Sequence, residues 1–253
     1  MLPAERMQAL LDYLDKHEVV SVDYLSRYLG VSKATVRRDI KELEERKKLI
    51  RTRGGVMTVA RGMTYEPAFH EKRSRKVDEK RRIAQAALKY LEQNETVILD
   101  SGTTALELAR LMTNYTGVVI TNDLYIAYEL ADYSGIELIM IGGSIKKGIH
   151  VATGCYAEMM LSGMRADKVF LGADAFDPKN GFMNANLEEV KIKQLMMQAA
   201  REINLLCDHT KFTRQSLAKV SEASEIDRII TDDEIESETE IELRELDIEL
   251  EIV

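Results

Sequence analysis

The chain has 253 residues, 45% of them hydrophobic, so it is long enough for two domains that each bury a core. Its 35 basic and 43 acidic side chains are unevenly placed: the net charge is +3 over residues 1–57, +4 over residues 58–82 and −15 over residues 83–253. A uniformly acidic enzyme does not need this asymmetry. It is typical of a DNA-binding head joined to a body that does not bind DNA.

Other classes are disfavoured by what the sequence lacks. No run approaches the roughly 18 apolar residues of a membrane span, and the first residues turn polar too early for a secretory signal. We therefore expect a cytoplasmic protein with no membrane contact. Cys155 and Cys207 lie in apolar segments and are expected to be buried, reduced thiols. The four histidines show no ligand spacing, so we expect no metal and no cofactor.

Two amphipathic helices are predicted at the N-terminus. The first has its apolar stripe on Met7, Leu10, Leu11 and Leu14. Ser21 is a suitable N-cap for the second, over residues 22–29. After Gly30, residues 31–40 are typical of the turn and second helix of a helix-turn-helix, the element that enters the DNA major groove.

The predicted recognition helix separates apolar from basic faces. Val36, Ile40 and Leu43 form one buried stripe. The following segment, 49–57, suits the wing of a winged helix, and residues 1–57 are assigned to this domain. The candidate DNA-binding residues are Ser32, Lys33, Thr35, Arg37, Arg38, Lys41, Arg51 and Arg53. The alternative is a three-helix bundle with a solvated charged face.

An irregular linker is expected over residues 58–77, because Pro67 interrupts any helix there. Its basic cluster, residues 72–76, has two possible roles, phosphate contact or solvated charge. From residue 78 onward a helix with Ile83 and Ala87 on one face leads into a different pattern.

Residues 78–253 alternate short apolar runs with helical segments, which indicates a mainly parallel sheet covered on both faces. The expected strands are 97–100, 118–121, 137–141, 168–171, 203–207 and 228–231. In the tail, Leu246, Ile248, Leu250 and Ile252 alternate with acidic residues, which predicts a half-exposed strand at a sheet edge.

Polar residues and glycines follow five of these strands, where open α/β sheets bind ligands. Gly102 allows close backbone approach, and the hydroxyls of Thr103 and Thr104 stand at a helix N-terminus that favours an anion. The candidate ligand-binding residues are Asp100, Ser101, Gly102, Thr103, Thr104, Thr121, Asn122, Gly142, Gly143, Asp174 and Lys211. Such a set suits a polyhydroxylated anion. Each residue taken alone is also explained as a helix cap or a turn.

The order and spacing of short motifs over residues 5–233 resemble those of the DeoR-type bacterial repressors. The matching segments are 5–6, 31–43, 51–55, 66–67, 79–84, 99–104, 121–122, 142–143 and 208–211. The resemblance implies a winged helix joined to a sensor domain for phosphorylated sugars. The body is also similar to the fold shared by ribose-5-phosphate isomerase and coenzyme A transferases. The resemblance adds Lys193 to the ligand site, whereas a surface pair with Glu189 is the rival explanation.

We therefore expect a transcriptional regulator, most simply a repressor of a sugar or carbohydrate catabolic operon. Two heads of a homo-oligomer would read paired half-sites of double-stranded operator DNA, and a phosphorylated sugar would change their affinity. Inducer or co-repressor, activator or repressor, and dimer or tetramer are alternatives that the sequence leaves open. So are the identity of the sugar and the operator sequence.

Two other classes compete with this interpretation. A sugar-phosphate isomerase would use Glu188 or Glu189 with Asp174 as base and stabilising group. A DNA-binding head is out of place on such an enzyme, so we expect no catalytic residues. A purely architectural DNA-binding protein would leave the predicted anion pocket unexplained.

Overall fold

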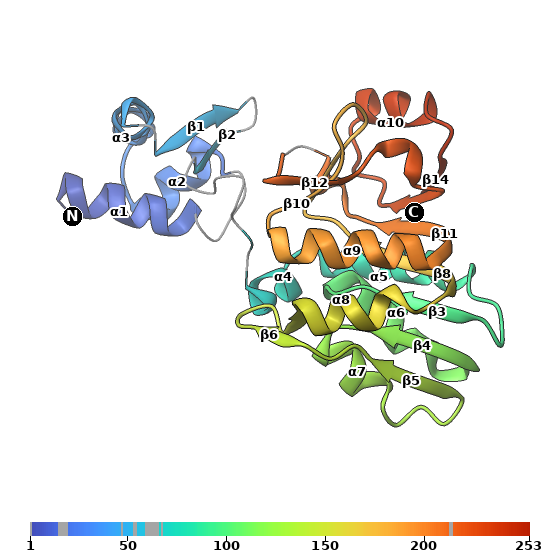
Figure 1. The fold of residues 1–253 in the computed structure, drawn as a ribbon. Helices are drawn as coiled ribbons and strands as arrows, with labels where there is room; N and C mark the ends of the chain where they lie inside the picture. Colours follow the sequence, from blue (N-terminus) through green and yellow to red (C-terminus); the bar gives the residue numbers. More distant parts are fainter. Residues whose placement is uncertain are drawn as a thin grey trace. The chain divides into compact units, whose positions relative to one another are not determined.

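A computed structural model describes residues 2–14, 20–46, 48–52, 55–58, 66, 68–212 and 215–253. The chain divides into two compact units, Met1–Gly62 and Met63–Val253, and each is described by itself (Figure 1). Within the described ranges, no helix combines the length and the apolar character that crossing a bilayer requires.

The first unit is a helix-turn-helix with a β-hairpin wing, as the sequence predicts. Its elements are α1 (Pro3–Leu14), α2 (Val22–Leu29), α3 (Lys33–Glu45), β1 (Leu49–Thr52) and β2 (Gly55–Thr58). The two strands pair antiparallel and form the wing. The helix α3 is the predicted recognition helix.

Local hydrogen bonds define the turn between α2 and α3. Gly30 ends α2 in the left-handed region, with φ of +64°, which glycine adopts without steric cost. Ser32 Oγ accepts the Thr35 N–H at 3.1 Å and caps α3. Ser21 Oγ caps α2 in the same way, through the Tyr24 N–H at 3.2 Å.

Each helix contributes an apolar stripe to the core of this unit. Leu10, Leu25 and Val36 are fully buried, and Ile40 is nearly so. Burying one such side chain contributes about 1.5–3 kcal/mol. Packing of these stripes, rather than intrinsic helix propensity, therefore supplies most of the stability of the short helices. The stripe on α3 therefore determines which of its faces is turned outward.

An ion pair that the sequence analysis missed also orients α3. Arg6 of α1 donates from Nε to Asp39 Oδ2 at 2.6 Å and from Nη2 to Asp39 Oδ1 at 2.9 Å. Asp39 is buried on the inner face of α3, whereas Arg38 beside it is exposed. A bidentate pair of this kind restricts rotation of the helix as well as its position.

The wing is attached to the chain ahead of α2. Val20 and Val56 exchange two backbone hydrogen bonds, of 3.0 and 2.9 Å. Gly55 lies so close to this bridge that an added Cβ would be 2.3 Å from the Val20 carbonyl oxygen. A larger residue at position 55 would force the wing away from α2.

The second unit is a three-layer α/β structure. Its helices are α4 (Phe69–Ser74), α5 (Val77–Leu88), α6 (Thr103–Leu111), α7 (Leu124–Leu130), α8 (Cys155–Ser162), α9 (Leu187–Ala199) and α10 (Ser237–Arg244). Its central strands are β3 (Thr96–Leu99), β4 (Gly117–Thr121), β5 (Ile136–Met140), β8 (Ala166–Gly172), β11 (Ala200–Leu206), β13 (Arg228–Thr231) and β14 (Glu249–Ile252). All neighbouring pairs among them are parallel, which confirms the predicted fold class.

Smaller elements surround this sheet. A second, antiparallel sheet contains β9 (Ala175–Asp177), β10 (Gly181–Asn184) and β12 (Ala218–Ser221). A hairpin is formed by β6 (Ser144–Lys146) and β7 (Val151–Thr153). Short 3-10 helices are η1 (Met112–Asn114), η2 (His209–Lys211) and η3 (Ala223–Glu225).

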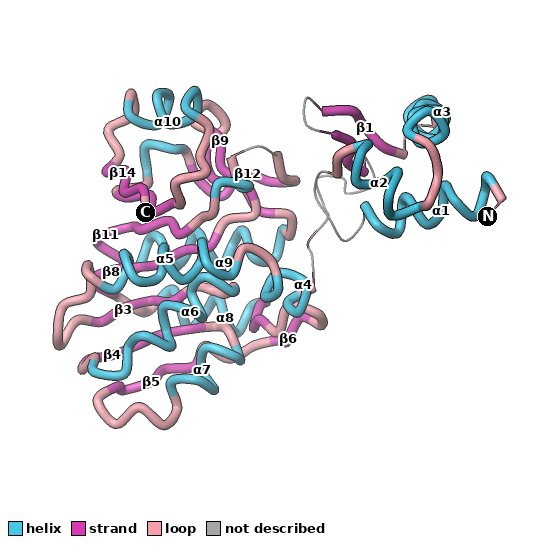
Figure 2. Tube along the Cα trace, turned by 180° about the vertical axis from the view of Figure 1, so that it is seen from behind, coloured by secondary structure: helices cyan, strands magenta, loops and turns pink. Residues whose placement is uncertain are grey.

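Helices cover both faces of the central sheet. The helices α5, α6 and α7 pack on one face and α8, α9 and α10 on the other, and the two layers are seen from opposite sides in Figures 1 and 2. In β3, Val97 and Leu99 pack toward the first layer and Ile98 toward the second, because successive strand side chains alternate. Covering both faces requires near-continuous apolar strands, as the sequence shows.

The strand order is β14-β13-β11-β8-β3-β4-β5, and it reverses direction between β3 and β8. From β3 the chain adds β4 and β5 on one side, whereas β8 and the later strands are added on the other. Ligands of open α/β sheets bind outside the carboxyl ends of the strands at such a switch point. Asp100 directly follows β3 and Gly172 ends β8, so the predicted strand-end residues meet there.

The predicted linker contains a helix, so the expectation of irregular chain over 58–77 is wrong for part of it. Residues 69–74 form α4, because the buried Phe69 anchors the segment in the core formed with α5, α6 and α7. Pro67 precedes this helix and does not interrupt it. Residues 59–65 and 67 lie outside the described residues.

Two further local predictions are corrected. Cys207 is buried as expected, but Cys155 is exposed, because it begins α8 on the side of the helix away from the sheet. The tail strand lies at the sheet edge as predicted but covers only residues 249–252. Leu246 and Ile248 precede it and pack as loop residues in the core of the second unit.

Because the two units have separate cores, a cavity in the first should leave the second intact. Ile40→Ala removes a nearly fully buried side chain from α3 and is expected to destabilise the first unit by about 2–5 kcal/mol. Urea unfolding followed by hydrogen exchange, resolved by segment, measures this. Lys41→Ala, at the exposed neighbouring position, is the control and should change stability by no more than about 0.5 kcal/mol. Equal loss of protection in both units would contradict the prediction.

Candidate functional site

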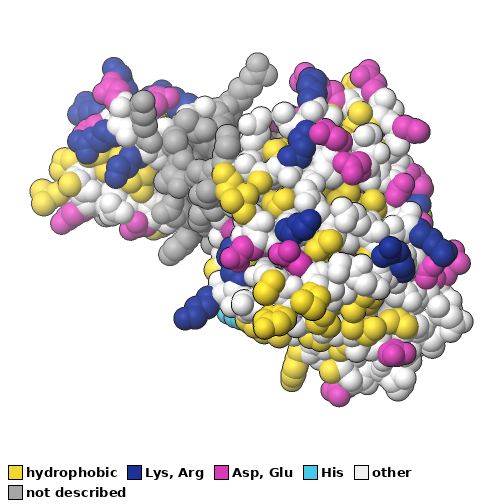
Figure 3. Space-filling model, viewed as in Figure 1, with side chains coloured by type: hydrophobic (Ala, Val, Ile, Leu, Met, Phe, Trp, Pro, Cys, Tyr) yellow, Lys and Arg dark blue, Asp and Glu magenta, His cyan; other side chains and the backbone are white. Residues whose placement is uncertain are grey.

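The outer face of α3 carries the predicted DNA-binding side chains. Lys33, Arg37, Arg38 and Lys41 are all exposed. Lys and Arg side chains gather on the N-terminal unit in the space-filling view (Figure 3). Three of these residues, at positions 33, 37 and 41, are four residues apart and form one stripe along the helix. The surface is therefore cationic where a helix-turn-helix meets DNA.

Some of the predicted residues have structural partners as well. Ser32 serves as the N-cap of α3. Lys33 Nζ pairs with Asp23 Oδ2 at 2.8 Å, and this hydrogen bond lowers the pKa of the Asp23 carboxyl. Arg51 of the wing pairs with Glu44 at 2.8 Å. Arg53 lies outside the described residues. Arg37 and Arg38 make no ion pair with any described residue, which leaves both guanidinium groups available to a polyanion.

At the switch point, Asp100 and Lys193 form a buried ion pair. The Lys193 ammonium, on α9, bonds to Asp100 Oδ2 and donates to the Gly172 carbonyl at 2.9 Å. Asp100 Oδ2 also accepts the Gly172 N–H at 3.0 Å. Both side chains are at most 3% exposed, so the surface Glu189–Lys193 pair is the wrong explanation for Lys193. Burial opposes the charge on Lys193, but Asp100 outweighs it and raises the pKa of the ammonium.

A second cluster lies at the end of β8. Lys72 of α4 donates to Glu66 Oε1 at 2.8 Å and to Asp174 Oδ1 at 3.3 Å. Asp174 Oδ2 accepts the Ala185 N–H at 3.0 Å. Burial raises the pKa of Asp174, but the charges of Lys72 and Lys211 outweigh it and lower that pKa to about 2. Lys72 belongs to the basic cluster 72–76. Because it pairs with two carboxylates of the second unit, it is not one of the solvated surface charges that were a possible interpretation of this cluster.

Glu189 lies beside both clusters and is the site's proton-holding carboxyl. It is buried, and Asn186 Nδ2 donates to its Oε1 at 2.6 Å. Burial, together with the nearby Glu66 charge, raises the pKa of Glu189 to about 8. At neutral pH this carboxyl is therefore mainly protonated, and the site holds one negative charge fewer than its residues suggest.

The predicted turn 100–104 is present and partly covered. Gly102 has φ of +126°, which L side chains rarely adopt, and open space where a Cβ would lie. Its N–H donates to Asp123 Oδ2 at 3.2 Å. Ser101 is half-buried, and Thr103 and Thr104, which begin α6, are buried. The helix N-terminus therefore points at the switch point with its hydroxyls largely covered by protein.

The ends of β4 and β5 are held by internal bonds. Thr121 Oγ1 accepts the Asp123 N–H at 3.2 Å, and Asn122 Nδ2 donates to the Ala152 carbonyl at 3.1 Å. The Gly142 N–H points to the sulfur of Met160 at 3.3 Å. A Cβ at position 143, where Gly143 stands, would lie 2.5 Å from the Thr153 carbonyl oxygen. Contact of these four strand-end residues with a ligand stays a prediction.

The charges of Lys72 in α4, Lys193 in α9 and Lys211 in η2 all act on Asp174. Lys211, in η2, is close enough to lower the pKa of Asp174 and of Lys80. Lys80 of α5 donates to the carbonyls of Lys72 and Arg75 at 2.5 Å each. Burial, together with the neighbouring lysine charges, lowers the pKa of Lys80 to about 8.

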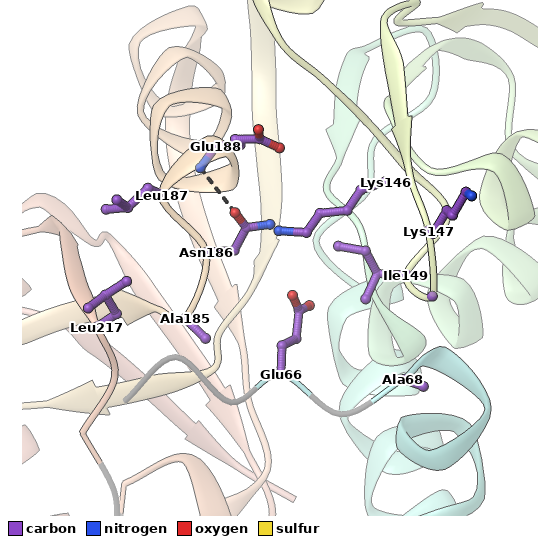
Figure 4. Close-up of a pocket in the computed structure, with 11 residues that line it drawn as sticks. Glu66, Ala68, Lys146, Lys147, Ile149, Ala185, Asn186, Leu187, Glu188 and Leu217 are labelled. Carbon is purple, nitrogen blue, oxygen red and sulfur yellow. Dashed lines mark hydrogen bonds between the residues drawn. The ribbon is translucent and has the colours of Figure 1, made fainter. Parts of the chain in front are cut away.

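A cavity of about 690 Å³ opens beside these clusters. It is lined by Glu66, Ala68, Lys146, Lys147, Gly148, Ile149, Ala185, Asn186, Leu187, Glu188 and Leu217. Lys146 extends toward Asn186, the Glu66 carboxylate points into the same space, and Lys147 points away (Figure 4). Among the described residues, neither Lys146 nor Lys147 has an ion-pair partner. The cavity therefore offers an uncommitted cation opposite amide and carboxylate groups.

None of the predicted ligand residues is among the described residues that line this cavity, although Asp174 lies next to it. Asp174 reaches it through the Ala185 N–H, and Lys72 reaches it through Glu66. Lys146, Glu66 and Asn186 were not predicted as site residues from the sequence. The Glu66-Pro67 motif was the one sequence feature that pointed to any of these residues. No local pattern indicates that the β6–β7 hairpin lies next to the segment before α4. Among the described residues, no group of His, Cys, Asp and Glu side chains is arranged to hold a metal ion.

Two family profiles match the chain. A DeoR-like helix-turn-helix domain matches residues 6–61, and a DeoR C terminal sensor domain matches residues 75–233. The second profile alone spans more than half of the sequence.

Curated relatives match over almost their full length. A protein of Escherichia coli O157:H7 named for the aga operon is 34% identical over 252 residues, 99% of this chain and 94% of that protein. The HTH-type transcriptional regulator GlpR of Haloferax volcanii is 32% identical over 96% of this chain and 95% of its own. The HTH-type transcriptional repressor GlcR of Bacillus subtilis is 33% identical over 92% and 89%.

Solved structures show a more distant likeness. Ribose 5-phosphate isomerase A from Methanocaldococcus jannaschii matches with a TM-score of 0.40 and 19% identity, over 53% of this chain and 54% of that chain. This level of similarity does not bear on function.

The pKa of Glu189 predicts a pH dependence of stability. Because the folded-state pKa of about 8 exceeds the ordinary glutamate pKa of 4.5, the folded state between these pH values holds a proton that the unfolded state has lost. The contribution of Glu189 to stability is therefore complete below pH 4.5 and declines as pH rises through about 8. Urea titrations across this range should show a smaller decline for Glu189→Gln than for the wild type. An unchanged pH profile would contradict the assignment.

Proposed function

The chain belongs to the DeoR family of transcriptional regulators, and we propose that it represses a sugar or carbohydrate catabolic operon under the control of a phosphorylated sugar. The observation that carries the proposal is the cavity lined by Lys146, whose wall residues Ala185 and Glu66 bond to Asp174 and Lys72 near the carboxyl end of β8. The names of the relatives, which refer to the aga operon, GlpR and GlcR, support a sugar-related target.

DNA recognition is assigned to the first unit. The exposed stripe of α3 presents Arg37 and Arg38 to base edges or phosphates, with Lys33 and Lys41 on either side. The acidic body, with its net charge of −15 over residues 83–253, repels the same polyanion. Two such units in a homo-oligomer, acting in the cytoplasm, would read the two half-sites of an operator.

Ligand recognition is assigned to the cavity and the clusters behind it. Lys146 provides an ammonium that no described carboxylate neutralises, which suits a phosphate group. Asn186 and Glu188 stand across the cavity, where amide and carboxylate groups suit sugar hydroxyls. Inorganic phosphate satisfies only the first of these, so a phosphorylated sugar is the better match.

Catalysis is disfavoured by the state of the carboxyl groups. An isomerase base must be ionised and free to take a proton. Asp174 is bound by Lys72 and by the Ala185 N–H, and Glu189 is mainly protonated at neutral pH. The relatives are named as transcriptional regulators, in agreement with a binding role.

The exposed arginines of α3 should carry duplex affinity. Arg38→Ala and Arg37→Ala are each expected to weaken binding by about 5- to 150-fold, equivalent to about 1–3 kcal/mol, if the arginine contacts a base. The probe is a duplex selected from a random library with the wild-type chain, and fluorescence anisotropy at several salt concentrations is the measurement. Arg165→Ala, an exposed arginine of the second unit, is the matched control. Equal affinities of Arg38→Ala and this control would contradict the assignment.

Ligand affinity should depend strongly on Lys146, which extends into the cavity, and weakly on Lys147, which points away from it. Lys146→Ala is expected to weaken sugar-phosphate binding about ten- to hundredfold, through loss of a charge-assisted hydrogen bond. Lys147→Ala removes the same charge from the adjacent position, which points away, and should have a much smaller effect. Thermal shift against a panel of phosphorylated sugars, with the parent sugars and inorganic phosphate, measures both.

The sugar phosphates that bind in this panel also test Lys211, whose charge acts on Asp174 at the edge of the site. Duplex binding with and without the sugar phosphate is measured by fluorescence anisotropy. Lys211→Ala should reduce the response of duplex binding to the ligand while leaving duplex affinity itself unchanged. Loss of duplex binding in this variant would show that the residue belongs to the DNA-binding function instead.

A further inference from the structure

Glu66 stands where the two units of the chain join in sequence. It lies four positions after Gly62, the last residue of the first unit. Its side chain is 11% exposed and accepts one hydrogen bond from Lys72 Nζ, at 2.8 Å. The carboxylate also forms part of the cavity wall, where it points into the open space (Figure 4). Glu66 therefore has its side chain in the cavity wall and its backbone close in sequence to the DNA-binding unit.

The helix that follows is anchored independently of Glu66. The Phe69 side chain is 2% exposed, and its N–H donates to the Gly148 carbonyl at 2.9 Å. At the other end of α4, Lys80 donates to the Lys72 and Arg75 carbonyls. Breaking the Glu66–Lys72 bond would therefore leave α4, and Lys72 with it, in place.

Glu66 is the exchangeable partner of Lys72. Asp174, the other carboxylate on this ammonium, is held by a second bond from the Ala185 N–H and does not line the cavity. Among the described residues, the Glu66 carboxylate has no hydrogen-bond partner other than Lys72. An anion entering the cavity meets Lys146 on one side and the Glu66–Lys72 pair on the other.

We propose that Glu66 is an internal competitor of the anionic ligand: a sugar phosphate bound in the cavity displaces the Glu66 carboxylate from Lys72 and so releases the chain between the two units. This inference rests on the proposed function and adds the route by which the ligand reaches the DNA-binding unit. Displacement exchanges one charge-assisted hydrogen bond for another, and Lys72 remains paired in both states.

Release changes the position at which the chain is anchored to the second unit. With Glu66 bound, the first described anchor is residue 66, and after release it is Phe69. The three additional residues extend the reach of the connection by up to about 10 Å, at about 3.4 Å per residue. The two states differ in how far apart paired heads can stand, which is the differential interaction that control of operator binding requires.

The test uses Glu66→Gln, which removes the charge and retains the shape. Two quantities are measured in the full-length chain with the selected duplex: the affinity for each binder among ribose 5-phosphate, glucose 6-phosphate and fructose 1-phosphate, and the coupling factor, the ratio of duplex Kd with and without that sugar phosphate. The variant should bind the sugar phosphate more tightly, because no internal carboxylate competes. Its coupling factor should fall from the 5- to 150-fold typical of allosteric pairs to about one.

Glu137→Gln is the charge-matched control, since Glu137 is exposed on β5 and lies outside the cavity lining. It also removes one negative charge, so it can strengthen anion binding, but it should keep the wild-type coupling factor. Glu66→Asp keeps the charge and shortens the side chain by one methylene, so it should also lose coupling. Thermal melts establish that each variant is folded.

The outcomes separate the two proposals. Wild-type coupling in both Glu66 variants, with normal ligand binding, overturns the role of Glu66 and leaves the proposed function standing. Binding of none of the three sugar phosphates by the wild-type chain contradicts the proposed function, and the role of Glu66 fails with it. Loss of coupling in both Glu66 variants but not in Glu137→Gln supports the inference.

Discussion

A charge that leaves water must find a partner, and at the carboxyl ends of β3 and β8 five buried or half-buried charges do so. Asp100 pairs with Lys193, and Asp174 shares Lys72 with Glu66. These pairs join the central sheet to α9 on one side and to α4 on the other. Because the Lys72 and Lys193 ammonium groups are already matched, an anion that bonded to either would have to replace a carboxylate. Under the proposed function, the pairing that stabilises the fold is also the pairing that a ligand would rearrange.

The winged helix was predictable because its determinants are local. Ser32 caps α3, Gly30 supplies the left-handed turn, and the stripe through Val36 and Ile40 sets the buried face. The parallel sheet was predictable for a similar reason, since apolar runs such as that of β3 alternate with helical segments. In a parallel sheet the carboxyl ends of neighbouring strands lie at one edge, so Asp100 and Asp174 could be named as strand-end residues from the sequence. Their contacts could not.

The rest depended on contacts between distant segments. Lys193 has Glu189 as a plausible partner four residues away, but packing of α9 on the sheet brings it to Asp100, 93 residues distant in sequence. The helix α4 was missed because Phe69 gains its burial from helices later in the chain. Lys146 has no local pattern that marks it as a site residue. These roles depend on tertiary packing, which the periodicity of the sequence does not indicate.

The account rests on two separate units whose binding equilibria are coupled. Thermodynamic linkage requires that a ligand which changes duplex affinity by some factor has its own affinity changed by the duplex by the same factor. Calorimetric titration of one sugar phosphate into the free chain and into its duplex complex, and of the duplex into the free and the sugar-phosphate-bound chain, measures both factors. The account predicts equal factors different from one. Sugar-phosphate affinity that is the same with and without duplex would contradict it.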